Sequence, residues 1–588
     1  MPCPQPAMTA GAVMKVCRPC LKCPKAALRA VQNRWGVQAK PARPRPFTNT
    51  TRRCDSQLSM QLIDTRVSRK TRGRLGEIIA ALAVIAAAHY SLVKPLKCDA
   101  GDKIDEHNYQ PSGRPELISF HEVQRHKSSD DCWIIIKGHV YDITNFIRSH
   151  PGGEHAILEQ AGQDVTGKFA MLHPPNALES LPSEMLLGPV DPTTLPAPEE
   201  KVFTEDERQR QEARGDMPVA QKFLLLQDFE YWAERVLSST AWAYYRSASD
   251  EERTFYENRN AFTRYFFRPR VLRDTSSGST ETSFIGLSSS MPIFISPAAM
   301  AKLGHPNGEI NLTKAAGEHG IIQVISSNAS CSLEEMFDAR KENQSLIFQL
   351  YLNKDRSVSK SLIKKVEKLG AKAIMFTVDV CWQSKRTLDV RSKSGSQAYV
   401  PPTSSPKGVS QAISGYQDTN LTWKDISFIR NNTDLPIIVK GVQCLEDVEL
   451  CIQNGVEGVV ISNHGGRQAD YAPAPIDILY EIRSHRPDLF SKIDIMIDGG
   501  VRSGSDIVKA LALGAKAVGI GRPFLYANGT HGEEGCRRVL EILSEEITNT
   551  MRNIGVIRVN ELKPEMVGPS GPWVGINRPI YAPLITRT

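Results

Sequence analysis

The residues best equipped for chemistry lie in one short run, residues 462–468, with the sequence SNHGGRQ. An apolar segment, 458–461, precedes the run and predicts a short buried strand. The imidazole of His464 can accept a proton near neutral pH, and the guanidinium of Arg467 can hold a carboxylate through two parallel hydrogen bonds. The two glycines between them permit a sharp turn close to a flat ligand. A loop histidine is more often merely solvated, so the rest of the chain must decide its role.

From residue 223 onward the chain repeats a simple pattern, in which an apolar strand is followed by a helical stretch. Eight strands alternating with helices over about 300 residues predict an α/β fold, a (β/α)8 TIM barrel over 223–588 that includes a C-terminal tail. Such barrels carry their functional groups at the carboxyl ends of the strands, and nearly every predicted strand here ends on a polar residue. The predicted strands are 292–296, 321–326, 346–351, 373–379, 436–440, 458–463, 493–498 and 517–521.

Two groups of strand ends fit the two halves of a phosphorylated planar cofactor. Glycines and arginines at the last two ends can bind a phosphate. Gln349, Thr377 and Lys440 can exchange hydrogen bonds with the edge of a ring, and Lys440 can stabilise negative charge on it. No Rossmann or P-loop glycine pattern offers another nucleotide site, so we predict FMN. The predicted FMN-binding residues are Ser296, Pro297, Ala298, Ala299, Ser326, Gln349, Thr377, Lys440, Asp498, Gly499, Gly500, Arg502, Gly521 and Arg522.

A second candidate site lies ahead of the barrel. Residues 132–142 predict two short strands around a Lys-Gly turn, and the motif HPGG then begins at His150. His173 follows 23 residues later, and each of the two histidines is next to a proline that fixes the backbone. Two such histidines suit the two axial positions of a haem iron. The segment 112–190 resembles the cytochrome b5 family, which implies a small α+β domain holding haem b through His150 and His173.

Residues 191–222 are rich in proline and then densely charged, which predicts a linker that is partly extended and partly helical. The charged stretch is expected to be solvated rather than to bind anything. Such a linker would hold the haem unit and the barrel at a high effective concentration.

The charge of this 588-residue chain is unevenly distributed. Residues 1–75 contain sixteen Lys and Arg against only Asp55 and Asp64. Although the whole chain has a net charge of +7, the rest of it, here called the body, is therefore mildly acidic. An acidic body favours a basic protein partner and argues against nucleic acid. The basic start predicts an import sequence, and the uncharged apolar segment 78–93 is shorter than the ~20 residues of a bilayer span. We expect 1–98 to direct the protein to the mitochondrial intermembrane space, with a retained membrane anchor as the alternative.

The barrel motifs together resemble one known family. Residues 228–563 are similar to the FMN-dependent 2-hydroxy-acid dehydrogenase/oxidase family, and with a haem domain in front the arrangement resembles its flavocytochrome b2 branch. The runs that carry the resemblance are AYY at 243–245, KLG at 302–304, QLY at 349–351, TVD at 377–379, IVKG at 438–441, SNHGGRQ at 462–468 and GRPFLY at 521–526.

The resemblance implies a role for each polar group around His464. His464 would take a proton from the substrate, and Asp379 would orient the imidazole and stabilise its charged form. Arg467 and Tyr244 would bind the substrate carboxylate, while Tyr351 would hydrogen-bond the 2-hydroxyl.

Two positions depart from the family pattern. Arg386, which would add positive charge near the developing oxyanion, keeps its spacing from Asp379, but the intervening residues 380–385 (VCWQSK) differ from the family's Ala-Pro and Gly. Asn328 stands where lactate-using members carry Leu, in the pocket for the substrate's side chain. A polar residue there leaves open a larger or more polar 2-hydroxy acid, although one lost apolar contact is worth only ~1–3 kcal/mol.

The resemblance implies oxidation of an L-2-hydroxy acid, with L-lactate to pyruvate as the leading expectation. Electrons would pass from FMN through the haem to cytochrome c, and the protein would form a homotetramer. An oxidase that uses oxygen is the alternative. A non-catalytic electron carrier is disfavoured by the complete set of site residues.

Overall fold

The computed structural model describes residues 117–150, 154–174, 177–196, 203–382, 384–394 and 416–569. The predicted presequence 1–98 with its apolar segment 78–93, the start of the predicted haem domain and the glycines of the HPGG motif lie outside these residues. Among the helices that are described, none combines the length and the apolarity needed to cross a bilayer.

The N-terminal domain is built on a four-stranded antiparallel sheet in the order β1-β2-β3-β4. Lys137 and Gly138, both with positive φ, make the predicted two-residue turn between β2 and β3. Ile134 and Ile136 of β2 pack in one core while Ile135 packs in another, as the period-two alternation of a strand requires. The elements are α2 (Phe120–Val123), β1 (Lys127–Ser128), β2 (Asp131–Ile136), β3 (His139–Asp142), α3 (Glu154–Leu158), α4 (Thr166–Leu172) and β4 (Leu186–Pro189).

The predicted linker 191–222 contains a helix that belongs to the barrel domain. Helix α5 (Glu205–Asp216) starts at a capping box formed by Thr204 and Glu207. On its inner side Arg210 donates to the carbonyl of Leu237, and Arg214 donates to the carbonyls of Val236 and Gly529, both at 3.3 Å. No residue of this charged helix is buried, in agreement with the predicted solvation, but Arg210 and Arg214 also bind backbone carbonyls, which was not predicted. The ordered flank of the barrel begins well before residue 223.

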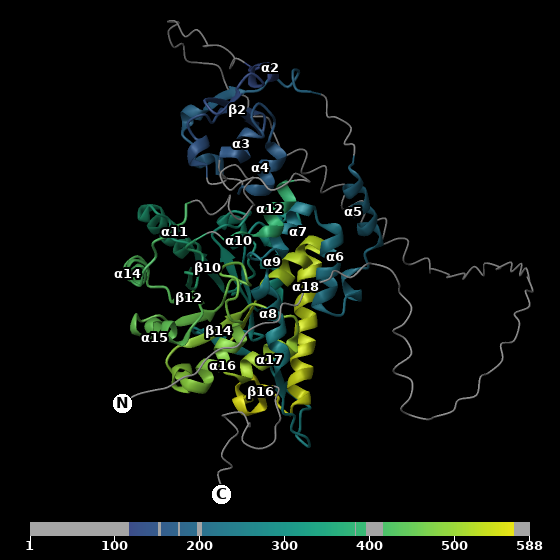
Figure 1. Cartoon of the computed structure of the whole chain (residues 1–588), viewed down its shortest axis with the longest axis vertical. Coiled ribbons are helices and arrows are strands. Elements are labelled where there is room, and N and C mark those ends of the chain that lie inside the picture. Colours follow the sequence, from purple (N-terminus) through teal and green to yellow (C-terminus); the bar gives the residue numbers. More distant parts are fainter. Residues whose placement is uncertain are drawn as a thin grey trace, which may run out of the picture. The chain divides into compact units, whose positions relative to one another are not determined.

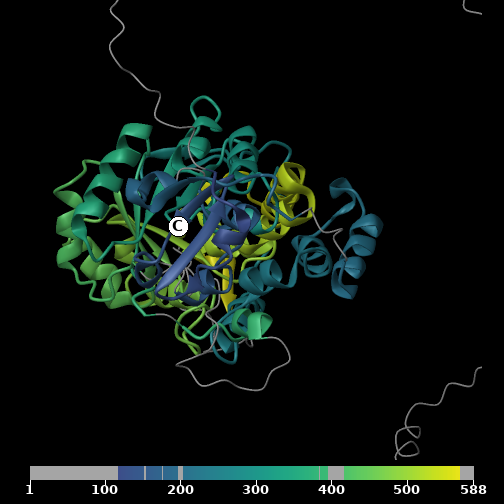
Figure 2. The same cartoon turned by 90° about the horizontal axis from the view of Figure 1, so that it is seen from above.

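The predicted barrel is confirmed as a closed ring of eight parallel strands, β8 to β15, in chain order. Figures 1 and 2 show its helices surrounding the strands. The strands are β8 (Ile293–Ala298), β9 (Ile322–Ser326), β10 (Leu346–Leu350), β11 (Ile374–Thr377), β12 (Ile437–Val442), β13 (Gly458–Ile461), β14 (Asp494–Asp498) and β15 (Val518–Ile520). The helices that follow them are α9 (Glu309–Glu318), α10 (Leu333–Asp338), α11 (Arg356–Leu369), α12 (Thr387–Ser394), α14 (Lys424–Arg430), α15 (Leu445–Gln453), α16 (Pro475–His485), α17 (Gly504–Ala512) and α18 (Arg522–Asn553).

Additional elements close the two ends of the barrel. The hairpin of β6 (Thr282–Phe284) and β7 (Leu287–Ser289) places Phe284 in the core inside the barrel, where its ring centre lies 5.9 Å from that of Phe294. Helices α6 (Leu226–Val236), α7 (Ser239–Arg246) and α8 (Arg253–Ala261) precede the barrel, and strand β5 (Tyr265–Phe267) pairs with β16 (Val567–Pro569).

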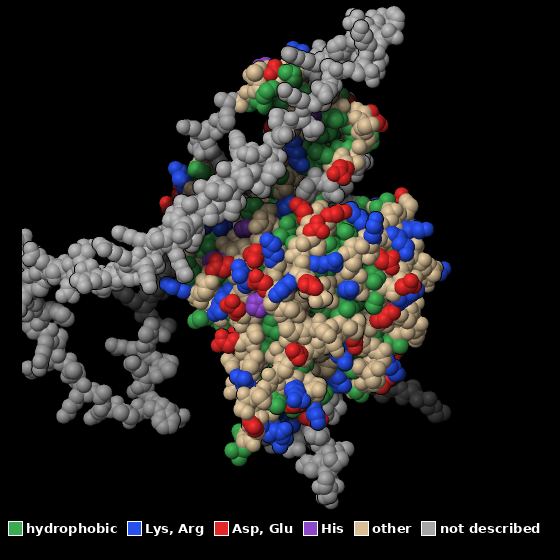
Figure 3. All heavy atoms as spheres, turned by 180° about the vertical axis from the view of Figure 1, so that it is seen from behind, with side chains coloured by type: hydrophobic (Ala, Val, Ile, Leu, Met, Phe, Trp, Pro, Cys, Tyr) green, Lys and Arg blue, Asp and Glu red, His purple; other side chains and the backbone are tan. Residues whose placement is uncertain are grey.

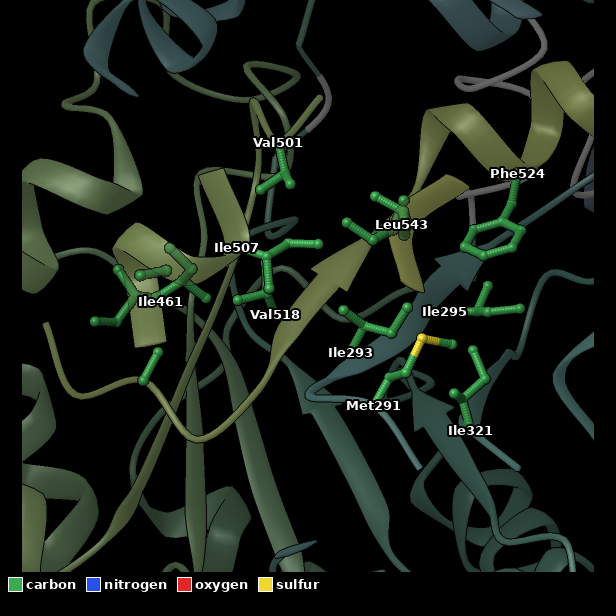
Figure 4. Close-up of a cluster of buried hydrophobic side chains, with 14 of the residues drawn as sticks. Met291, Ile293, Ile295, Ile321, Ile461, Val501, Ile507, Val518, Phe524 and Leu543 are labelled. Carbon is green, nitrogen blue, oxygen red and sulfur yellow. The ribbon is translucent and has the colours of Figure 1, made fainter. Parts of the chain in front are cut away.

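Side chains along the strands alternate between an outer and an inner core. Ile293 and Ile295 of β8 belong to the large cluster shared with the helices, while Phe294 between them belongs to the cluster inside the barrel. Figure 4 shows part of the outer cluster, in which Ile293 and Ile295 lie near Phe524 and Leu543 of α18. This alternation determines which residues at the strand ends point into the barrel.

Candidate active site

A ring of buried polar side chains closes the inner core at the carboxyl ends of the strands. Each member stands two positions after an apolar residue of the inner core, so the period-two geometry of the strand directs it into the barrel as well. The register supports this, because Gln349 lies beside Ser326 and Thr377 lies beside Lys440 on neighbouring strands. The buried polar residues are Ser296, Ser326, Gln349, Thr377, Lys440, Ser462 and Asp498.

Part of this ring has no protein partner. The Lys440 ammonium donates to Ser462 Oγ at 2.8 Å and lies 3.4 Å from Asp498 Oδ2. By contrast, Gln349 Nε2 and Thr377 Oγ1 are buried without a hydrogen-bond partner among the described residues. Because an unpaired buried polar group costs about 1–3 kcal/mol, such groups indicate a missing polar partner. The ring therefore fits the predicted edge of a flavin.

His464 forms the predicted pair with Asp379. Its Nδ1–H donates to Asp379 Oδ1 at 2.9 Å, which leaves Nε2 with a lone pair that can accept a proton. His464 itself has a positive φ of 55°, as do the two glycines that follow it. A Cβ on Gly465 would lie 2.6 Å from the Arg522 guanidinium, and one on Gly466 would lie 2.7 Å from a backbone nitrogen of α8. The loop is thus held tightly against its neighbours.

Burial and charge set the protonation states of this pair. Burial lowers the pKa of His464 below its ordinary value of 6.5, and the Asp379 carboxylate offsets part of that effect. Burial alone would raise the pKa of Asp379, but His464 and Lys440 outweigh it and the pKa is lowered. A neutral imidazole beside an ionised carboxylate is the state that a general base requires.

The predicted substrate residues line one cavity beside this pair. Burial raises the pKa of Tyr351 and of Tyr244, so both phenols remain protonated hydrogen-bond donors. Burial and the nearby Arg386 lower the pKa of Arg467 to about 10, which keeps it charged at neutral pH. The cavity is lined by Tyr244, Pro297, Ala298, Ala299, Ser326, Asn328, Tyr351, Val380, Ser384, Arg386, Gln417, His464, Arg467, Gln468, Gly521, Arg522 and Leu525.

The two arginines of the predicted phosphate site differ in their protein contacts, because Arg522 is fully engaged by carbonyls and Arg502 is not. Arg522 donates to the carbonyls of Tyr245, Ser247 and Gly465 at 3.0–3.1 Å. Two of these carbonyls lie at the end of α7, where no intrahelical donor remains, and they attract a buried guanidinium. Arg502 Nε lies 3.5 Å from the carboxylate of Glu230. Phosphate binding by Arg502 and Arg522 stays a prediction, and the buried Nε of Arg502 has no hydrogen-bond partner among the described residues.

The glycines of the predicted phosphate site are required by their surroundings. Gly499 and Gly500 have φ values of 104° and 81°, and a Cβ on Gly500 would lie 2.0 Å from the carbonyl oxygen of Asn258. Asn258 in turn exchanges two hydrogen bonds, of 2.7 and 2.8 Å, with the amide of Asn463, next to His464.

The structure also assigns roles to residues that the sequence analysis missed. Ser462 accepts hydrogen bonds from Lys440 and from the backbone N–H of His464. The alternation of side chains along a strand could have identified Ser462, since it stands two positions after Val460, which points into the barrel. Asn258 and Tyr416 gave no signal, because their partners lie 205 and 88 positions away along the chain.

A buried carboxylate, Glu309 at the start of α9, joins two loops of the cavity wall. Its Oε1 accepts from the backbone N–H groups of Ala301 and Ser330 at 2.9 and 3.0 Å. Its Oε2 accepts from Ser330 Oγ at 2.8 Å and from the backbone N–H of Cys331 at 3.1 Å. These four donors satisfy the charge without a cation.

The two predicted haem ligands lie close together in the N-terminal domain, with their rings tilted by 37°. The ring centres of His150 and His173 are 6.0 Å apart. An imidazole nitrogen binds a metal at about 2 Å, which places the ring centre about 3 Å from the metal, so this gap fits one iron between two axial rings. His173 stacks on Phe169 with ring centres 4.4 Å apart, and burial with the nearby His150 lowers its pKa to about 4. A neutral imidazole is the form that binds a metal.

Comparisons with known proteins agree with this division of the chain. The FMN-dependent dehydrogenase family model matches residues 233–569, and the model of the cytochrome b5-like heme/steroid binding domain matches residues 119–191. An L-lactate dehydrogenase (cytochrome) of Wickerhamomyces anomalus is 39% identical over 522 residues, covering 88% of this chain and 89% of that protein. A glycolate oxidase of Spinacia oleracea is 37% identical over 351 residues, covering 57% of this chain and 93% of the oxidase.

A solved structure shows the same relationship. The recombinant flavin-binding domain of baker's yeast flavocytochrome b2 is similar with a TM-score of 0.58 and 41% identity, covering 62% of this chain and 91% of that domain. With one family model over more than half of the chain and a relative aligned along most of its length, the chain belongs to the FMN-dependent dehydrogenase family and carries a cytochrome b5-like haem-binding domain ahead of its flavin barrel.

Proposed function

We propose that this protein oxidises an L-2-hydroxy acid, with L-lactate to pyruvate as the leading reaction, and passes the electrons through its haem to cytochrome c. The observation that carries the proposal is the 2.9 Å bond between His464 and Asp379, beside a cavity that also contains Arg467. The relative named L-lactate dehydrogenase (cytochrome) aligns over both domains, whereas the glycolate oxidase aligns over the barrel alone.

Different residues of the site take part in proton transfer and in substrate binding. His464 Nε2 takes a proton from the substrate, and the imidazolium that forms is stabilised by the Asp379 carboxylate. Arg467 and Tyr244 bind the substrate carboxylate, and Tyr351 donates a hydrogen bond to the oxygen on carbon 2. Arg386, whose buried Nε has no partner among the described residues, adds positive charge beside that oxygen.

The cofactors extend this chemistry to electron transfer. The cofactors would supply the redox chemistry when bound, FMN as the acceptor of the two electrons that the substrate loses and the haem as a one-electron carrier to the final acceptor. Gln349, Thr377 and Lys440 would hold the edge of the flavin, and His150 and His173 would hold the haem iron.

We propose the same destination and assembly that the sequence suggested. The basic segment 1–75 and the apolar segment 78–93 support targeting to the mitochondrial intermembrane space, with a retained anchor as the alternative, and we propose a homotetramer. Acidic and basic side chains are interspersed on the face of the described residues visible in Figure 3. Attraction to a basic cytochrome would therefore be spread over the surface and weakened by salt.

Anaerobic stopped-flow spectroscopy of the holoenzyme with L-lactate tests the proposal. We expect flavin bleaching followed by reduced-haem bands. The His464→Gln variant should keep the spectra of both oxidised cofactors while its flavin reduction slows by about 10²–10⁴-fold. Unchanged flavin reduction in this variant would remove His464 as the base. Bleaching without haem reduction, accompanied by peroxide formation in air, would favour the oxidase.

A further inference from the structure

One wall of the cavity carries a polar side chain held in a fixed orientation. Asn328 lies in the loop between β9 and α10 and lines the same cavity as His464 and Tyr351. Its Oδ1 accepts a hydrogen bond of 2.6 Å from the hydroxyl of Tyr416, and its backbone N–H donates to Ser326 Oγ at 3.1 Å. The amide oxygen and the backbone of Asn328 are therefore both held by protein groups, and one of the two partners, Ser326, also lines the cavity.

This anchoring determines which end of the amide is available to a ligand. Burial raises the pKa of Tyr416, so its hydroxyl stays protonated and can continue to donate to the amide oxygen. The amide nitrogen of Asn328 makes no hydrogen bond within the part of the chain that the structure describes. An NH2 group carries two donors, so the cavity wall presents donors and lacks an acceptor at this point.

The charges around the cavity favour the same kind of ligand. Three arginines line it, Arg386, Arg467 and Arg522, although the guanidinium groups of the last two also donate to backbone carbonyls. Of the neighbouring Asp379 carboxylate, Oδ1 is engaged with His464, and Oδ2 is buried without a hydrogen-bond partner among the described residues. A methyl group against Asn328 would leave the amide donors unpaired and exclude water from them, whereas an oxygen there would accept a hydrogen bond.

We infer that Asn328, oriented by Tyr416, selects 2-hydroxy acids that carry a hydrogen-bond-accepting oxygen on carbon 3. The inference rests on the proposed function, since it assumes that carbon 2 is oxidised beside His464, and it revises only the preferred substrate, from L-lactate to an acid with an oxygen on carbon 3. L-Glycerate is the matched probe, because it is L-lactate with one added hydroxyl on carbon 3. Asn328 is then a specificity-determining residue, and Tyr416 is a positioning residue that acts through it.

The test compares kcat/KM for L-glycerate and L-lactate in the full-length holoenzyme by anaerobic flavin reduction. We expect the wild type to prefer L-glycerate by roughly tenfold. Asn328→Leu, which keeps the size and removes the donors, should reverse the preference. Tyr416→Phe, which removes only the hydroxyl that fixes the amide, should reduce the preference and leave the flavin and haem spectra intact.

The outcomes separate this inference from the function on which it rests. If the ratio of kcat/KM for L-glycerate to that for L-lactate is near one in the wild type and neither substitution changes it, the role of Asn328 is overturned. Flavin reduction by L-lactate would still support the proposed function. If neither acid reduces the flavin, the proposed function and the inference both fail. A preference for L-glycerate that Asn328→Leu abolishes and Tyr416→Phe preserves would support Asn328 and overturn the positioning role of Tyr416.

Discussion

The proton acceptor of this site is controlled by two opposing effects on one imidazole. Burial favours the neutral form of His464, while the ionised Asp379 favours the charged form. The balance leaves His464 neutral at the start of the reaction and leaves Asp379 ready to stabilise the proton once it arrives. The kinetic consequence is an acid limb in the pH profile, because protonation of His464 removes the base.

Replacing Asp379 by Asn should change both the position of this limb and the rate above it. Without the carboxylate the pKa of His464 falls further, so the acid limb of kcat/KM should move to lower pH. The plateau should drop by about 10²-fold or more, since the imidazolium loses its partner. Flavin reduction measured from pH 4.5 upward checks this, with Asp488→Asn at an exposed ion pair as control. A limb that moves to higher pH would contradict the assignment.

At the scale of the elements, Gly441 at the end of β12 keeps space for Asp379. Its φ is 111°, and a Cβ there would lie 2.6 Å from Asp379 Cβ. Gly441→Ala should therefore displace the carboxylate and lower kcat by about 10²-fold, because small displacements of catalytic groups are costly.

Gly455 provides the matched control for that substitution. It also has a positive φ, 68°, but a Cβ there would meet nothing within 4 Å. Gly455→Ala should lower the free energy of unfolding by about 1 kcal/mol and leave kcat unaffected. Thermal unfolding and flavin-reduction rates of the two variants separate backbone strain from displacement of Asp379. Equal effects on kcat would show that Gly441 has no particular relation to Asp379.

The barrel could be predicted from the sequence because each strand is a short apolar run that ends on a polar residue. Gln349, Thr377 and Lys440 were found because each stands at or near the end of a predicted strand. Contacts between distant segments could not be predicted, since nothing local links Tyr416 to Asn328 or Asn258 to Asn463. Helix α5 was read as linker because its charges look solvated, whereas Arg210 and Arg214 bind carbonyls that only the folded chain brings near.

At the scale of the whole molecule, the two domains should be separable by function. His173→Ala removes one of the two proposed haem ligands, so haem binding should be lost or weakened while the barrel is untouched. Flavin reduction by L-lactate should persist, and cytochrome c reduction should fall by about 10²-fold, since the tethered carrier is lost. His139→Ala, on an exposed position of the same domain, is the control. Unimpaired cytochrome reduction by a haem-free variant would show that the flavin reduces cytochrome c directly.

The carboxylate of Glu309 has a consequence for how this enzyme can diversify. It holds the loops after β8 and β9 through Ala301, Ser330 and Cys331, none of which is among the residues lining the cavity. The part of the framework that Glu309 holds is thus made by residues that do not line the cavity. Position 328 can therefore accept different side chains in the course of evolution without disrupting the contacts of Glu309. A single substitution there can change the substrate specificity of the enzyme while its fold is retained.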